Sequence, residues 1–153
     1  MEEKKRKTPE QRAGLAKYMT GAVLASIIAV ILNIAYYFAY SAATASPPPP
    51  TITPVSVILV TLVAVLFGGF AYFILSRMTG YATIIFVIGG LLLAGATTST
   101  SFMPYIPPAK ALYPREYVLL AAPMHFIAAL CSVWIIPIIV RRRKKRWRSE
   151  LHG

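Results

Sequence analysis

The chain has 153 residues, 57% of them hydrophobic, and its sixteen Lys and Arg against five Asp and Glu give a net charge of +11. A chain of this length that is so rich in apolar segments has no room for a separate large soluble domain. In a soluble protein this charge would indicate nucleic-acid binding, but here the cations cluster beside apolar segments, where anionic lipid headgroups attract them. We therefore expect membrane lipids with anionic headgroups as partners and no nucleic acid.

Four long segments of the chain carry no charge at all. Residues 18–40, 55–76, 81–98 and 117–140 contain no Asp, Glu, Lys or Arg. At a rise of about 1.5 Å per residue they reach roughly 27 to 36 Å, which matches a hydrocarbon core of about 30 Å. The sequence predicts an all-α membrane protein, with four transmembrane helices in an up-down-up-down bundle over residues 18–140. Basic tails, residues 1–17 and 141–153, flank it.

The first apolar segment has an alternative interpretation as a cleaved signal peptide. A basic region precedes it, and residues 43–45, Ala-Thr-Ala, have the small-x-small form that signal peptidase accepts. The apolar core of a signal peptide normally has about 7 to 15 residues, whereas this segment has about 23. We therefore expect it to be retained as a membrane anchor.

The distribution of cations predicts the orientation. Six Lys or Arg precede the first span, seven follow the fourth, and Arg77 lies between the second and third. An up-down-up-down chain places these fourteen on one side and leaves only Lys110 and Arg115 on the other. By the positive-inside rule both termini are cytoplasmic, in a multi-pass protein of the inner (plasma) membrane. The predicted headgroup contacts are Lys4, Lys5, Arg6, Lys7, Arg141, Arg142, Arg143, Lys144, Lys145 and Arg146.

Glycines inside the spans predict close helix packing, because small residues let membrane helices approach one another. The predicted packing positions are Gly68, Gly69, Gly89, Gly90 and Gly95. The same surfaces allow association with other membrane protein subunits or between copies of this chain.

A few polar residues inside the spans form a candidate layer. Counting residues from the span midpoints puts Asn33 and His125 about 5 to 6 Å to the outer side, with Thr61 about 7 Å outward and Tyr36 one turn beyond Asn33. Because the first and fourth helices of such a bundle are neighbours, we expect Asn33 to meet His125. His125 has three interpretations. It forms structural hydrogen bonds, for example to a carbonyl freed by Pro123, or it belongs to a substrate or proton site, or it ligates a metal or haem.

The spans lack the residues that several chemistries need. His125 is the only histidine within a span, whereas a b-type haem needs two axial ligands on facing helices. The spans contain no Asp or Glu for coupled transport, and no hydrolytic motif is present. We expect no enzyme activity, no cofactor and no metal.

Three features of the sequence are similar to those of an uncharacterised bacterial family of four-span integral membrane proteins of unknown function. They are an Ala-rich first span with Asn33 and Tyr36, a Pro-rich loop ending in Thr-Pro-Val-Ser at residues 53–56, and a fourth span with Pro-Met-His at 123–125 and a late Ile-Pro. The resemblance covers roughly residues 15 to 141. It implies the four-span fold and supplies no activity.

The functional prediction is a non-catalytic integral membrane protein that acts as an accessory or scaffold subunit of a membrane assembly. The alternative is a small carrier or permeation unit with its polar layer at Asn33, Thr61 and His125. Haem or quinone binding through His125 ranks below both.

Overall fold

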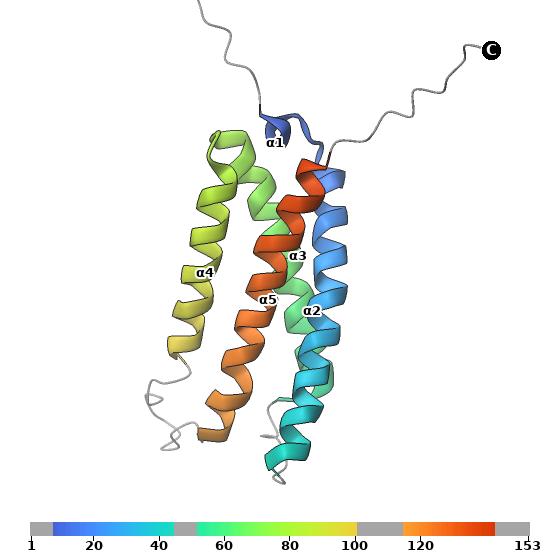
Figure 1. The fold of residues 1–153 in the computed structure, drawn as a ribbon, viewed down its shortest axis with the longest axis vertical. Helices are drawn as coiled ribbons and strands as arrows, with labels where there is room; N and C mark the ends of the chain where they lie inside the picture. Colours follow the sequence, from blue (N-terminus) through green and yellow to red (C-terminus); the bar gives the residue numbers. More distant parts are fainter. Residues whose placement is uncertain (1–7, 45–51, 101–114, 143–153) are drawn as a thin grey trace, which may run out of the picture.

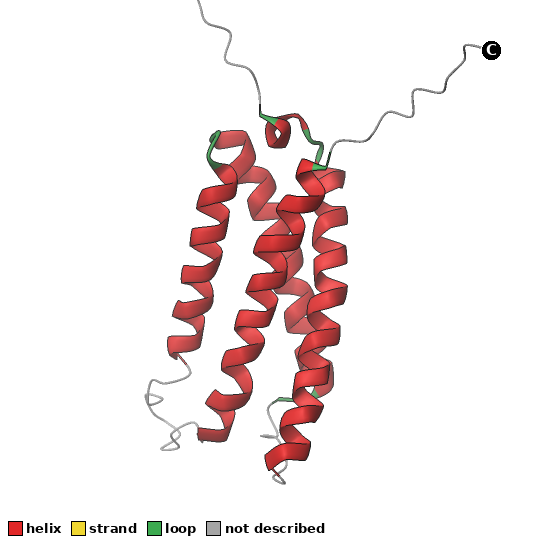
Figure 2. Ribbon diagram, viewed as in Figure 1, coloured by secondary structure: helices red, strands yellow, loops and turns green. Residues whose placement is uncertain are grey.

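The structure is a computed structural model that describes residues 8–44, 52–100 and 115–142, and every regular element in these ranges is a helix (Figure 2). Along the chain the helices are α1 (Pro9–Arg12), α2 (Leu15–Thr44), α3 (Pro54–Met78), α4 (Ala82–Thr100) and α5 (Arg115–Arg141). Helices α2 to α5 are each long and apolar enough to cross a membrane. The chain is thus a four-span multi-pass membrane protein, as predicted.

The folded bundle begins earlier in the chain than the sequence indicated. Helix α2 starts at Leu15, and α1 packs against α3 and α5. Residues 8–17, which were assigned to a basic tail, therefore belong to the bundle. The physical reason is that α1 carries its own initiation signal, a capping box in which Thr8 and Gln11 exchange side chain to backbone hydrogen bonds.

Helix α3 begins with the same device. The Thr53 hydroxyl accepts a hydrogen bond from the Ser56 amide at 3.1 Å, and the Ser56 hydroxyl accepts one from the Thr53 amide at 2.9 Å. Pro54 occupies the first turn, where its missing N–H is not needed. The start of the second span is therefore defined by local side chains.

The long helices form one bundle in which α2 packs most extensively on α5 and α3, while α4 packs mainly on α5 and less on α3. Successive long helices run in opposite directions (Figure 1). As a result α1, the turn between α3 and α4, and the last turn of α5 gather at one end of the bundle, drawn at the top. We call this the α1 end and the opposite one the far end.

The apolar core is divided into two clusters. The cluster nearer the α1 end is built on Ala22, Ala25 and Ala29 of α2, each fully buried, together with aromatic and branched residues of the other helices. The cluster nearer the far end consists of Tyr37, Val57, Leu120 and Met124. Between them, at the level of Asn33 and Thr61, the buried residues are polar.

Three of the five predicted packing glycines lie at close helix contacts. A Cβ on Gly69 would lie 2.5 Å from Ala22 Cβ, one on Gly68 would lie 2.8 Å from Ser132 Oγ, and one on Gly90 would lie 2.6 Å from Val133 Cγ1. These distances are shorter than van der Waals contact, so only glycine fits unless a neighbour moves.

The other two glycines do not pack inside the bundle, and the prediction for them was wrong. Nothing lies within 4 Å of a Cβ built on Gly89 or Gly95. The reason is the rotation of α4, which turns Ala82, Phe86 and Ala94 inward instead.

Candidate functional site

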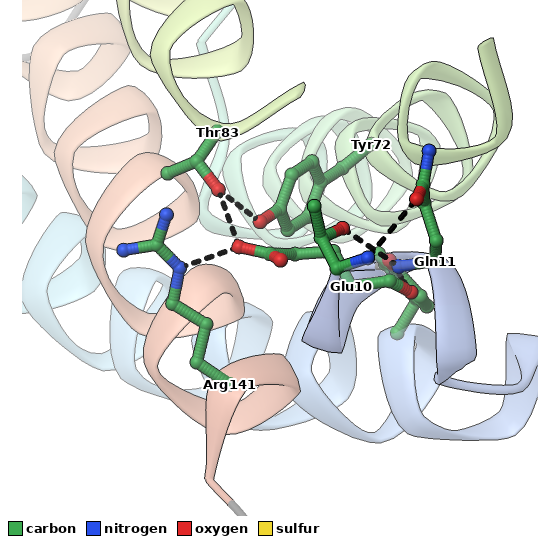
Figure 3. Close-up of polar contacts among 7 residues, drawn as sticks. Glu10, Gln11, Tyr72, Thr83 and Arg141 are labelled. Atoms are coloured by element: carbon green, nitrogen blue, oxygen red, sulfur yellow. Dashed lines mark hydrogen bonds and ion pairs between the residues drawn. The ribbon is translucent and has the colours of Figure 1, made fainter. Parts of the chain in front are cut away.

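The most specific group of polar contacts lies at the α1 end and centres on Glu10. Its carboxylate accepts a hydrogen bond from Arg141 Nε at 2.7 Å and one from the Thr83 hydroxyl at 3.2 Å (Figure 3). The Tyr72 hydroxyl lies 2.6 Å from the Thr83 hydroxyl. One carboxylate on α1 is thereby joined directly to α4 and α5, and through Thr83 to α3.

Backbone carbonyls near α1 receive further side chains from the long helices. The Tyr18 hydroxyl donates to the Glu10 carbonyl at 2.9 Å, and Arg77 donates to the carbonyls of Gln11 and Ala13 at 2.8 and 3.1 Å. The Glu10 carbonyl also accepts from the Ala13 amide, so Tyr18 is its second donor. Because a short helix has few internal partners for its carbonyls, Arg77 satisfies groups that would otherwise need water. We call Glu10, Tyr72, Thr83 and Arg141 the α1 lock.

The ionisation of Glu10 follows from this environment. Burial by itself raises the pKa of a carboxylate, but hydrogen bonds from its own backbone amide and from Arg141, together with the Arg141 charge, outweigh burial. The pKa of Glu10 therefore lies below its ordinary value, and the group is a carboxylate at neutral pH. The Glu10 side chain is 10% exposed and that of Arg141 54%, so solvent screens part of the attraction between them.

One of the predicted headgroup contacts, Arg141, has a partner within the protein. Its Nε donates to Glu10, while its side chain is 54% exposed, so the prediction of a headgroup contact stays a prediction. The backbone carbonyl of Arg142 accepts a hydrogen bond from the Lys17 ammonium. The other predicted contacts, residues 4–7 and 143–146, lie outside the described residues.

Within the membrane-spanning region, Asn33 is paired with Thr61 and not with His125. The amide nitrogen of Asn33 donates to the Thr61 hydroxyl at 3.0 Å, and both residues are buried. The expected Asn33–His125 hydrogen bond does not form, because the rotation of α2 directs the amide toward α3. The Asn33 Oδ1 atom has no partner among the described residues.

Tyr36, also predicted for the polar layer, forms a hydrogen bond with helix α5. Its hydroxyl donates to the Leu119 carbonyl at 2.7 Å. In a helix this carbonyl would accept from the residue four positions later, which here is Pro123 and has no N–H. Tyr36 on α2 therefore satisfies the carbonyl that the proline in α5 leaves free, as neighbouring helices do in membranes.

His125 is half-buried, and no hydrogen bond joins it to another described residue. The depth of His125 in the bundle follows from the contact between Gly68 on α3 and Ser132 on α5, two helices that run in the same direction. Thr61 lies seven residues before Gly68, and His125 lies seven residues before Ser132, both toward the far end. Seven residues are about two turns, so each residue shares a helix face with its reference position. Thr61 and His125 therefore lie at one level.

Thr98 on α4 joins the same level and was not predicted. Gly90 on α4 faces Val133 on α5, and these two helices are antiparallel. Thr98 lies eight residues after Gly90 and His125 lies eight residues before Val133, so both lie toward the far end by the same distance. Thr98 is 7% exposed, and its Oγ1 atom, like Asn33 Oδ1, has no partner among the described residues. We call Asn33, Thr61, Thr98 and His125 the polar layer, to which each long helix contributes one residue.

The residues of the α1 lock were also missed, although the sequence held part of the signal. Thr-x-x-Gln over residues 8–11 is a recognisable capping box, and Glu10 is an acidic residue among many cations. Neither observation indicates that Arg141, far along the chain, is the partner.

Comparisons with protein-family models, curated proteins and solved structures give no match for this chain. Of the resemblance drawn from its sequence, what the structure bears out is the four-span membrane architecture.

Proposed function

We propose that this protein is a non-catalytic accessory or scaffold subunit of a membrane assembly. The observation that supports this role is the α1 lock, in which the buried carboxylate of Glu10 is engaged by Arg141 and Thr83. Its contacts tie helices together, as a rigid support requires, and leave no open carboxylate at that point for acid–base chemistry.

The proposal includes an orientation and a location. The positive-inside rule applied to the fourteen cations favours cytoplasmic termini, with the α1 end on the cytoplasmic side of a plasma or inner membrane. The resemblance to bacterial four-span proteins fits this location.

The outer face of α4 is the surface that we propose for a partner's transmembrane helix. Ile85, Gly89, Leu92 and Ala96 follow one another at helical spacing, and all four are exposed. Glycine weakens a helix by about 0.5 to 1 kcal/mol relative to alanine, yet Gly89 makes no close contact within the bundle. A partner helix packed there would use the space that Gly89 leaves.

Photocrosslinking in native membranes tests this proposal. A photoreactive residue at Leu92, 69% exposed, is compared with one at Phe67, 71% exposed on α3. We expect one defined membrane-protein adduct from position 92, none from position 67, and loss of the adduct when Gly89→Leu is added. Equal adducts from both positions, or none from either, would contradict a partner surface on α4.

A second candidate function is the small carrier or permeation unit. The observation that favours it is the polar layer, where Asn33 Oδ1 and Thr98 Oγ1 are buried without partners. An isolated oligomer with a water-accessible interior would support this function over the accessory one.

A further inference from the structure

The two unpartnered atoms of the polar layer, Asn33 Oδ1 on α2 and Thr98 Oγ1 on α4, lie at one depth in the bundle. Asn33 is 18 residues from the start of α2 and Thr98 is 16 residues from the start of α4, and both helices start at the α1 end. At about 1.5 Å per residue these separations are roughly 24 to 27 Å. Asn33 is 1% exposed and Thr98 is 7% exposed.

Leaving such atoms unpaired is unfavourable in this environment. Hydrocarbon offers no hydrogen bonds, so a buried polar atom in a membrane protein needs a partner within the protein or a bound molecule. Asn33 already donates to Thr61, yet its carbonyl oxygen is left over. Within the described part of the chain, nothing satisfies it.

The chemistry of these atoms specifies the missing partner. Asn33 Oδ1 is an acceptor only, the Thr98 hydroxyl can donate or accept, and a neutral imidazole at His125 offers one donor and one acceptor. The guest must therefore donate a hydrogen bond to Asn33 Oδ1, and a hydroxyl group, which also accepts, suits Thr98 and His125 as well. No Asp, Glu, Lys or Arg lies within residues 18–40, 55–76, 81–98 or 117–140 to balance an ion, and an unbalanced charge at this depth is costly.

We propose that the polar layer is a binding site for a neutral hydroxyl group, supplied by water or by the headgroup of an uncharged lipid. The site lies at the level between the two apolar clusters, where the buried residues are polar. Buried water of this kind usually makes about three hydrogen bonds to groups that would otherwise be unsatisfied. His125 is half-buried, so part of this residue lies at the surface of the bundle, where the hydroxyl of an uncharged lipid would meet it.

Two measurements on the full-length protein in lipid nanodiscs identify the source of the hydroxyl. In the first, an X-ray pulse generates hydroxyl radicals from bound water, and mass spectrometry locates the oxidised side chains. Met124, one residue from His125, is compared with Cys131 in the cluster nearer the α1 end; both carry sulfur, and each is 8% exposed. In the second, an organic extract of the purified protein is searched for a stoichiometric uncharged lipid.

Water in the layer is expected to give oxidation at Met124 well above that at Cys131, and a lipid hydroxyl is expected to give a retained uncharged lipid instead. Thr98→Val, which removes the hydroxyl at nearly constant volume, should abolish whichever signal is found. Thr98→Ser should keep it, and so should Thr20→Val, whose hydroxyl is exposed. The proposal is overturned if the native protein shows neither signal, or if Thr98→Val leaves the signal unchanged. The native measurement needs no variant, so a failure of Thr98→Val to fold does not remove the test.

Discussion

The Tyr36 hydroxyl lies 2.7 Å from the Leu119 carbonyl, an acceptor near the start of α5 that Pro123 leaves without its helical donor. The contact joins the first and fourth spans near the far end of the bundle, where α5 would otherwise present a carbonyl without a donor. A helix with an internal proline is thus made compatible with the membrane by a side chain from its neighbour.

Removal of this hydroxyl should destabilise the bundle in a way that depends on the proline. We expect Tyr36→Phe to lower the free energy of unfolding in detergent by about 1 to 3 kcal/mol, since the Leu119 carbonyl is left unpaired. In a Pro123→Ala background the alanine N–H can take the carbonyl, so the same substitution should cost clearly less. The two backgrounds form a double-mutant cycle. An equal loss of unfolding free energy in both would show that the effect of Tyr36 on stability does not depend on Pro123.

The α1 lock predicts a dependence of stability on pH. Because the pKa of Glu10 is below its ordinary value of about 4.5, its contribution to stability is complete above that value and is lost as the pH falls through the folded-state pKa. We expect the melting temperature of the native protein to fall more steeply below about pH 4 than that of Glu10→Gln. Arg12→Gln, which alters an exposed charge on the same helix, is the control and should follow the native curve.

At neutral pH the same Glu10→Gln substitution should cost about 1 kcal/mol, because an amide keeps one hydrogen bond but loses a half-exposed ion pair. Thermal unfolding in detergent measures this difference. Stability equal to or above that of the native protein would show that burial of the carboxylate outweighs its partners.

The glycines of the bundle predict opposite responses to one added methyl group. Gly69→Ala should cost about 1 to 3 kcal/mol, since its Cβ would lie 2.5 Å from Ala22 Cβ, which cannot rotate away. Gly89→Ala has open space around it and should be neutral or stabilising by up to about 1 kcal/mol. Similar melting temperatures for the two variants would mean that α2 and α3 separate more easily than their contact distance indicates.

The Asn33–Thr61 hydrogen bond predicts that the Thr61 hydroxyl contributes to the stability of the bundle. Thr61→Val should cost about 0.6 to 2 kcal/mol by leaving the Asn33 amide without its acceptor, and Thr61→Ser should retain most of the stability. The control is Thr20→Val, whose exposed hydroxyl bonds only to its own helix at Ala16. Equal effects of the valine substitution at positions 61 and 20 would argue against a buried interhelical bond.

Cysteine labelling in a background without Cys131 tests the orientation. A membrane-impermeant reagent applied from outside should modify cysteines at Thr51 and Lys110, which lie outside the described residues, and spare those at Thr8 and Arg77. A cysteine at Glu150 should also be spared. The reverse pattern would invert the proposed topology.

The sequence by itself determined the number, length and approximate limits of the spans. The bilayer acts as a uniform apolar solvent, and about 20 uncharged residues satisfy its thickness whatever their order, so composition along the chain is enough. Local signals also determined helix starts, as at Thr53, where the residues that exchange hydrogen bonds are three positions apart.

Only the tertiary structure decided which residues meet. The spans are apolar on every side, so no hydrophobic stripe indicates which face of a helix turns inward, and helix rotation depends on how small residues such as Gly69 and Ala22 fit together. That rotation pairs Asn33 with Thr61 in place of His125 and turns Gly89 away from the core. Glu10 and Arg141 are 131 residues apart in the chain, and they can pair because an even number of crossings returns the chain to the end of the bundle at which it began.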